Sequence, residues 1–157
     1  MPASHAMPID EDFLQIAIDE AEAASARGEV PIGAVLVSDN NVVLARDGNR
    51  VLERHDPSAH AEMLVLRAAA LAVGNERLVG TTLYATLEPC TMCAGLISLS
   101  RVARLVYAAD DPKGGAVEHG AQFFKQSTCH HRPEVSQVDD GGKSAKLLTD
   151  FFRNRRV

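Results

Sequence analysis

The chain has 157 residues, of which 46% are hydrophobic and 24% are charged, and its formal net charge is −5. This balance is typical of one globular domain, and it excludes a disordered chain, a collagen and a coiled coil. Three cysteines are too few for a disulfide scaffold, and no uncharged apolar run approaches the roughly 20 residues of a membrane span. The first twelve residues lack the basic start and apolar stretch of a secretory signal, which predicts a cytoplasmic protein with no membrane partner.

The charge is unevenly distributed along the chain. Residues 1–30 contain seven acids and one base, whereas the last fifteen residues contain five bases and one acid. The acidic overall balance argues against a nucleic-acid partner, and the basic end argues for one. Basic residues late in a helix also complement the helix dipole, so charge alone leaves the partner open.

Hydrophobic periodicity and turn residues predict helices and strands in alternation. Asp10 is the expected N-cap of the first helix, and Gly28 is expected to end it. An initial hairpin followed by alternating strands and helices predicts an α/β layered fold, in one domain over 10–157 after a mobile terminus over 1–9. The expected elements in chain order are a helix at 10–27, strands at 30–37 and 42–45, a loop at 47–59, a helix at 60–73, a strand at 82–86, a helix from just after Pro89 to about Leu99, a strand at 104–108, a loop at 109–120, an irregular segment at 121–141 and a helix at 143–156.

Two motifs at expected helix N-termini carry metal-binding chemistry. They are His60-Ala61-Glu62 and Pro89-Cys90-Thr91-Met92-Cys93. Cys90 and Cys93 stand at i and i+3 on a first turn, where their sulfurs can converge and the helix dipole favours thiolates. Two thiolates and one imidazole supply three ligands to a tetrahedral Zn²⁺ ion, which leaves a fourth position for water.

Glu62 is expected to move protons rather than to bind the metal. Positions i and i+2 do not share a helix face, but a long carboxylate in the first turn can reach over a water on the metal. Zinc lowers the pKa of such a water to about 7, and a carboxylate beside it can take that proton and pass it to a leaving amine.

Other interpretations of these residues remain open at this point. The Cys90–Cys93 pair alone also fits a thioredoxin-like redox motif. A closed structural zinc site would need a fourth protein ligand, and it would make the chain a zinc-stabilised binding module rather than an enzyme. The candidates for that ligand are His55, Cys129, His130 and His131, which we otherwise interpret as ordinary loop residues.

The H-x-E and P-C-x-x-C motifs together are the signature of the zinc-dependent nucleoside deaminases. The surrounding sequence resembles the bacterial tRNA-specific adenosine deaminases from about residue 10 to residue 156. The matching blocks are Glu29-Val30-Pro31-Ile32-Gly33-Ala34-Val35, Gly48-Asn49-Arg50, Asp56-Pro57-Ser58-Ala59-His60-Ala61-Glu62, Leu87-Glu88-Pro89-Cys90-Thr91-Met92-Cys93-Ala94-Gly95, Asp111-Pro112-Lys113-Gly114-Gly115-Ala116 and Phe151-Phe152-Arg153-Asn154-Arg155-Arg156.

The resemblance implies a cytidine-deaminase-like three-layer α/β/α sandwich with a central mixed five-stranded sheet, acting as a homodimer. It implies hydrolysis of adenosine to inosine at the wobble position of a tRNA anticodon, with tRNA-Arg as the expected substrate and one Zn²⁺ per subunit. A guanine or cytidine deaminase that acts on small molecules shares the same signature and is the alternative. The implied roles are His60, Cys90 and Cys93 as zinc ligands, Glu62 as proton shuttle, Asn49 and the backbone of Ala61 and Glu62 as base contacts, Val30 and Pro31 as pocket walls, and Asp111, Lys113, Phe151, Arg153, Arg155 and Arg156 as RNA contacts.

Overall fold

A computed structural model describes residues 8–155 of the chain, and its centre is a five-stranded sheet in the order β2-β1-β3-β4-β5. β1 pairs antiparallel with both β2 and β3, whereas β3, β4 and β5 run parallel. The expected fold class with a mixed sheet is therefore confirmed. The elements are α1 (Pro8–Ala26), β1 (Gly33–Val37), β2 (Val43–Gly48), α2 (Val51–Arg54), α3 (Ala61–Val73), β3 (Thr82–Leu87), α4 (Thr91–Leu99), β4 (Arg104–Ala109), the 3-10 turn η1 (Phe123–Lys125), β5 (Glu134–Gln137) and α5 (Lys143–Arg155).

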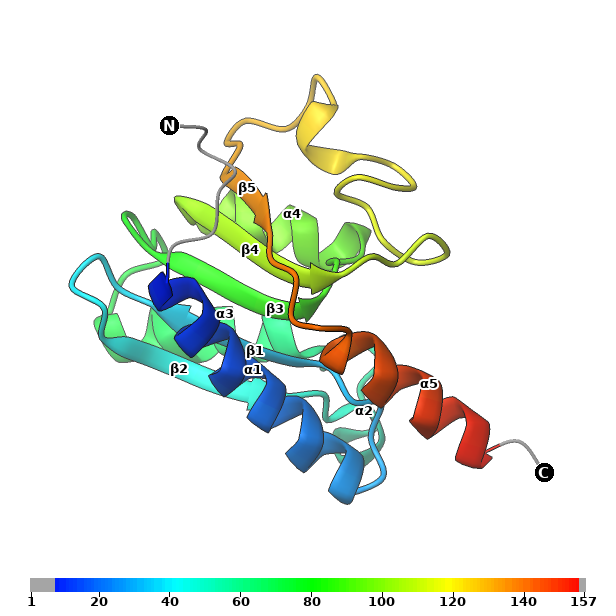
Figure 1. The fold of residues 1–157 in the computed structure, drawn as a ribbon. Helices are drawn as coiled ribbons and strands as arrows, with labels where there is room; N and C mark the ends of the chain where they lie inside the picture. Colours follow the sequence, from blue (N-terminus) through cyan, green and yellow to red (C-terminus); the bar gives the residue numbers. More distant parts are fainter. Residues whose placement is uncertain (1–7, 156–157) are drawn as a thin grey trace.

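Helices cover both faces of this sheet, as Figure 1 shows with α1 and α5 on one side and α3 and α4 on the other. Successive side chains of a strand point to opposite faces, so Val35 packs towards α1 while Leu36 packs towards α3. α1 lies very close to the sheet. A Cβ on Gly33 would stand 1.9 Å from the Ala17 carbonyl oxygen, so only glycine permits this approach.

Several expected boundaries and one cap were wrong. The first strand begins at Gly33 rather than at residue 30, and the strand expected at 42–45 continues to Gly48. The expected loop at 47–59 contains the short helix α2, and the irregular segment at 121–141 contains η1 and β5. Asp10 is not an N-cap, because it lies inside α1 and its carboxylate accepts hydrogen bonds from Arg104 and from the Tyr84 hydroxyl.

The expected mobile terminus at 1–9 lies mostly outside the described residues, and its last two residues, Pro8 and Ile9, begin α1. None of the helices in the described part of the chain is long and apolar enough to cross a membrane.

Candidate metal centre and active site

The topology brings the two metal-binding motifs to one edge of the sheet. The start of β1 pairs with the end of β2 through Gly33 and Gly48, and it pairs with the end of β3 through Ala34 and Ala85. α4 begins shortly after the end of β3. The Arg50 N–H, just after β2, donates a hydrogen bond to the carbonyl oxygen of Ala59, just before α3. Both helices therefore begin at this edge.

His60 and Cys90 are the N-cap residues of α3 and α4, and Cys93 lies in the first turn of α4. The Nδ1 atom of His60 lies 3.6 Å from each sulfur, and the three ligand atoms lie within 4.8 Å of one another. Zinc bonds of 2.1 Å to nitrogen and 2.3 Å to sulfur at a tetrahedral angle require about 3.6 Å between these atoms. The geometry of the three residues therefore fits a zinc ion.

This group contains no fourth His, Cys, Asp or Glu within residues 8–155. Cys129 is buried elsewhere, where its thiol donates to the His131 carbonyl oxygen at 3.2 Å. The His131 ring contacts the Val102 carbonyl oxygen at 2.7 Å, while His130 and His55 are exposed. The alternative of a closed structural site with one of these residues as fourth ligand is not supported.

The pKa values of the two cysteines are shifted in opposite directions. The hydrogen bond from the Cys93 thiol, together with the nearby His60 ring, lowers the pKa of Cys90 to about 4 despite partial burial. The same hydrogen bond and burial raise the pKa of Cys93. A bound cation favours the deprotonated thiol, so metal binding would release the proton that this pair shares.

Glu62 lies in the first turn of α3, where only 4% of the residue is exposed. Its Oε1 atom is buried and has no hydrogen-bond partner within the described part of the chain. Burial raises the pKa of Glu62, because the charged form loses its hydration. A buried carboxylate oxygen without a partner is costly, and such an atom beside a metal-ligand group is well suited to exchange protons with a substrate or a water.

Asn49 follows β2 directly and is buried next to the same helix end. Its Oδ1 atom accepts a hydrogen bond of 2.8 Å from the Ala61 N–H, and its Nδ2 amide has no hydrogen-bond partner among residues 8–155. The Ala61 N–H is thus engaged within the protein, and Ala61 is completely buried. Val30 and the buried Pro31 lie in the segment before β1, which is joined to Asn49 by the hydrogen bond from the Asn49 N–H to the Ile32 carbonyl oxygen.

The expected RNA contacts lie on two other segments. Asp111 begins a turn after β4, where its Oδ1 atom accepts the N–H groups of the exposed Lys113 and of Gly114. In α5, Arg153 is exposed. Arg155 is partly engaged within the protein, because its guanidinium donates to the Gly28 carbonyl oxygen at 3.0 Å and stands over the Phe151 ring at 4.5 Å. Arg156 lies outside the described residues.

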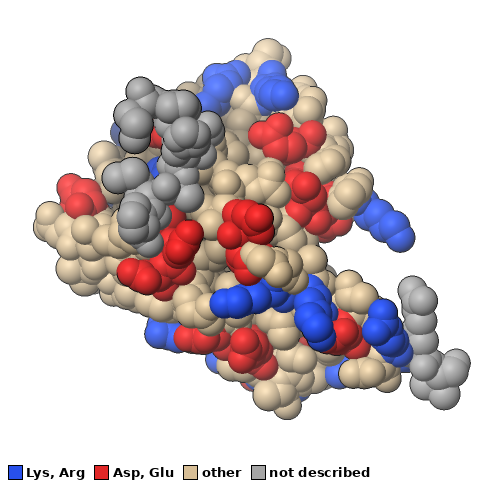
Figure 2. All heavy atoms as spheres, viewed as in Figure 1, with Lys and Arg blue, Asp and Glu red and all other residues tan. Residues whose placement is uncertain are grey.

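Basic side chains gather over α5 on the face seen in Figure 2, where acidic side chains alternate with them. The region is thus mixed in charge rather than uniformly basic. Within α5, Lys146 and Asp150 form an exposed ion pair of 2.6 Å, which neutralises part of the helix.

Sequence reasoning missed the roles of two residues that contact each other, Glu88, which lies two positions before Cys90, and His119. Glu88 lies within a motif that was recognised, but its role depends on hydrogen bonds to residues more than twenty positions away. No local pattern signals such bonds.

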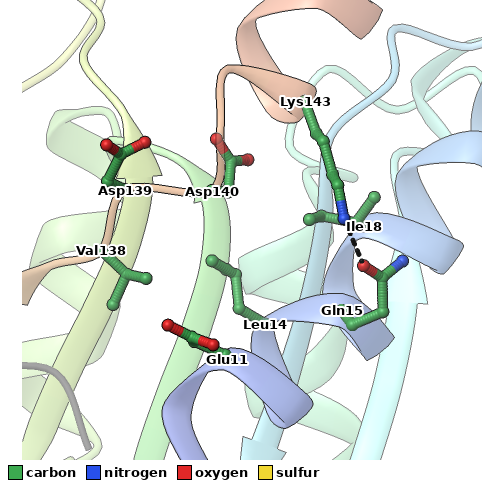
Figure 3. A pocket seen from close by; sticks show the side chains of 8 residues that line it. All are labelled: Glu11, Leu14, Gln15, Ile18, Val138, Asp139, Asp140 and Lys143. Atoms are coloured by element: carbon green, nitrogen blue, oxygen red, sulfur yellow. Dashed lines mark hydrogen bonds between the residues drawn. The ribbon is translucent and has the colours of Figure 1, made fainter. Parts of the chain in front are cut away.

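A separate cavity of about 180 Å³ lies between α1 and the segment before α5. Figure 3 shows the carboxylates of Glu11, Asp139 and Asp140 around it, and the hydrogen bond from Lys143 to Gln15 across one side. It shares no residue with the metal centre. An acidic lining of this kind disfavours phosphate, so we do not assign it to an RNA substrate.

Comparisons with known proteins identify the family. Residues 7–109 match the model of the cytidine and deoxycytidylate deaminase zinc-binding region. A tRNA-specific adenosine deaminase of Agrobacterium fabrum is 55% identical over 145 residues, which cover 92% of this chain and 95% of that protein. The chain belongs to the tRNA-specific adenosine deaminase family. A family member from Haemophilus influenzae is 42% identical, with 94% of this chain and 85% of that protein covered.

Solved structures agree with this assignment. A structure from a study of A-to-I editing by tRNA:A34 deaminases is 56% identical, has a TM-score of 0.84, and covers 87% of this chain and 99% of that one. A guanine deaminase from Bacillus subtilis is more distant, with 31% identity, a TM-score of 0.63 and coverage of 92% and 93%.

Proposed function

We propose that this chain hydrolyses adenosine to inosine at the wobble position of a tRNA anticodon, with tRNA-Arg as its substrate, in the cytoplasm and as a homodimer. The observation that carries the proposal is the buried Oε1 atom of Glu62, which has no hydrogen-bond partner among residues 8–155 and lies in the first turn of the helix whose N-cap is His60. The identity with tRNA-specific adenosine deaminases over almost the whole chain supports the choice of substrate.

One zinc ion per subunit would be held by His60, Cys90 and Cys93, whose spacing fits its tetrahedral coordination. When bound, zinc acidifies the water that attacks the base. The three residues would fix the ion at the N-termini of α3 and α4, where the helix dipoles stabilise the thiolates.

Glu62 would carry the protons of the reaction. Its Oε1 atom takes a proton from the attacking water and delivers it to N1 of adenine, which makes C6 more electrophilic. As the C–N bond then breaks and the C6 carbonyl forms, the same carboxylate takes the remaining hydroxyl proton from the oxygen added at C6 and passes it to the amino group, which leaves as ammonia. The raised pKa of Glu62 supports both steps, because a carboxyl group of higher pKa is a better base and still gives up its proton.

Recognition would begin with a base turned out of the anticodon loop, because a deaminase cannot reach C6 inside a stack. Asn49 Nδ2 would donate to the flipped base, with the backbone near Ala61 and Glu62 along its edge. The contacts further out would come from Val30 and Pro31 as pocket walls, Asp111 and Lys113 on flanking nucleotides, and Phe151, Arg153, Arg155 and Arg156 on the stem-loop.

Deamination of free guanine is the second candidate, because the Bacillus subtilis guanine deaminase has a similar structure. That similarity is lower in both identity and TM-score than the similarity to the tRNA deaminase structure. A free base also needs no contact with the basic end of α5.

The test combines metal analysis with product analysis. The purified protein is assayed for zinc and incubated with a tRNA-Arg transcript whose anticodon begins with A, with a transcript carrying G at that position as control. We expect one zinc per subunit and an A-to-G readout at position 34 alone. Ammonia release from guanine or cytidine with the tRNA unchanged would replace the proposal with the small-molecule alternative.

A further inference from the structure

The carboxylate of Glu88 lies between the metal-ligand turn and the loop at 110–119. Its side chain is completely buried. The Oε2 atom accepts the backbone N–H groups of Val117, Glu118 and His119 at 3.0–3.1 Å, and the Oε1 atom accepts the Asp111 N–H at 3.1 Å. One carboxylate thus holds both ends of the loop.

The backbone joins the same two segments. The Glu88 N–H donates to the Ala109 carbonyl oxygen, and the Ala116 N–H donates to the Pro89 carbonyl oxygen, each at 2.9 Å. A Cβ on Gly115 would stand only 2.5 Å from the carboxyl carbon of Glu88. The loop is therefore packed directly on the turn that carries Cys90.

His119 completes the arrangement from the outer side. Its Nδ1 atom lies 2.8 Å from Glu88 Oε1, and more than a third of its side chain is exposed. Glu88, Asp110 and His119 also lie close enough together to suggest a second metal site. The oxygens of Glu88 already accept five hydrogen bonds, and Asp110 accepts one from Gln137, so these oxygens are occupied within the protein and we do not assign a metal to them. We call Glu88 together with its donors in Asp111, Val117, Glu118 and His119 the clasp.

The clasp determines the position of the turn that faces solvent. Asp111 gives its N–H to Glu88, and its own carboxylate accepts the N–H groups of Lys113 and Gly114. The position of the exposed Lys113 therefore depends on a chain of hydrogen bonds that starts at Glu88.

We propose that Glu88 is a positioning residue for RNA binding, which fixes the loop at 110–119 relative to the metal centre, with His119 closing the contact. The proposal rests on the proposed function, since it assigns to this loop a place against the nucleotides beside the edited base. It requires that Glu88 acts on substrate binding and not on the metal or on the chemical step.

The main variant is Glu88→Gln, and Glu118→Gln is its matched control. A glutamine side chain must turn its NH₂ group towards backbone N–H donors on one side or the other, so the clasp cannot form fully. Glu118 is the exposed neighbour, and its substitution removes the same charge while its backbone N–H and every other donor to Glu88 stay in place.

Three measurements on the zinc-loaded proteins separate the possible roles. For Glu88→Gln we expect amide exchange of Asp111, Val117, Glu118 and His119 to become at least about tenfold faster, and KM for the tRNA to rise about tenfold. We expect kcat to stay within about twofold and the zinc content to stay unchanged. The control should match the wild-type protein in all of these quantities.

Two further variants test the proposal if Glu88→Gln does not fold. His119→Ala removes one donor from the clasp, and His119→Asn can restore a donor near the position of Nδ1. We expect KM to rise severalfold in the first variant and to return towards the wild-type value in the second.

Unchanged amide exchange in Glu88→Gln would overturn the proposal, and so would loss of zinc or a fall in kcat at unchanged KM. Equal KM values for His119→Ala and His119→Asn would show that the hydrogen bond from His119 does not contribute to RNA binding. If the proposed function itself is wrong, the wild-type protein will leave the tRNA unmodified. This outcome is distinguishable, because amide exchange still shows whether Glu88 holds the loop.

Discussion

Two glutamates of the same site show how differently one residue type can be used. Glu62 and Glu88 are both buried, with 4% and 2% of each residue exposed, and both lie beside the metal ligands in sequence. Glu62 has an oxygen with no partner in the described part of the chain, whereas both oxygens of Glu88 accept several hydrogen bonds. Burial alone therefore does not distinguish a chemical role from a structural one.

The pKa shifts of the two glutamates follow from these partners. Burial raises the pKa of Glu62, since few groups stabilise its charge. Burial acts in the same direction on Glu88, but hydrogen bonds from the Asp111 backbone and from His119 outweigh it and lower the pKa. A carboxylate whose lone pairs are already used cannot exchange protons with a substrate, so the donor count separates the two roles.

The largest expected effect is on turnover, in Glu62→Gln. The amide keeps the shape of the side chain but cannot take up a proton, so kcat should fall by about a thousandfold or more. The melting temperature should stay close to that of the wild-type protein, because the amide fills the same buried volume. Steady-state kinetics and calorimetry of the zinc-loaded variant measure both. Turnover within tenfold of the wild-type value, or loss of zinc, would contradict the role of Glu62.

Asp10 extends the comparison to the opposite face of the sheet. Its carboxylate accepts two hydrogen bonds of 2.8 Å from Arg104 and one of 2.7 Å from the Tyr84 hydroxyl. Asp10→Asn breaks this buried ion pair, so we expect the free energy of unfolding to fall by about 3 kcal/mol with kcat unchanged. Urea denaturation measures the loss, with the exposed Glu11→Gln as control. A loss below about 1 kcal/mol would show that burial of the pair contributes little.

Glu29 should give a smaller effect of the same kind. Its two oxygens accept the backbone N–H groups of Leu52 and Glu53 at the start of α2. Glu29→Gln removes one of these acceptors, so we expect a loss of about 1 kcal/mol in the free energy of unfolding and faster amide exchange at both residues. Glu22→Gln, which alters an exposed carboxylate of α1, is the control. Unchanged exchange in α2 would show that Glu29 does not hold this helix.

The parts of the site that sequence analysis located are those with local signals. The helix starts near His60 and Cys90 follow from the apolar periodicity after His60, from Pro89 and from the i, i+3 spacing of the cysteines, and the structure brings these residues together. The family resemblance assigned Asn49 and the Ala61 backbone to the base, but the hydrogen bond between them was not predicted, because nothing in either segment points to the other.

The parts that sequence analysis missed depend on distant partners. β5 has the sequence Glu-Val-Ser-Gln and, among the described residues, pairs with β4 alone. An edge strand with one apolar residue leaves no hydrophobic pattern in the sequence. The partner of Asp10 lies 94 positions away at Arg104, which is why the residue resembled a helix cap. Glu88 lies in a motif that sequence analysis recognised, but only the structure shows that its carboxylate accepts backbone N–H groups of the loop at 110–119.

The smallest expected effect is the pH dependence of the contact between His119 and Glu88. The hydrogen bond to Glu88 raises the pKa of His119 above its ordinary value of 6.5, with further help from the negative charges of Asp110 and Glu118. A raised pKa in the folded state means that the contribution of His119 is fully present below about pH 6.5 and is lost as pH rises through the raised value.

Amide exchange at Val117 and His119, corrected for its intrinsic pH dependence, should therefore be faster near pH 9 than near pH 6, and the His119 ring should titrate above 6.5 by NMR. The contact is partly exposed, so the change should be well below that of Glu88→Gln. In His119→Asn the residual pH dependence of the loop should disappear, since asparagine does not titrate. A loop with the same corrected exchange rate at both pH values in the wild-type protein would mean that Glu88 holds it through the backbone N–H groups alone.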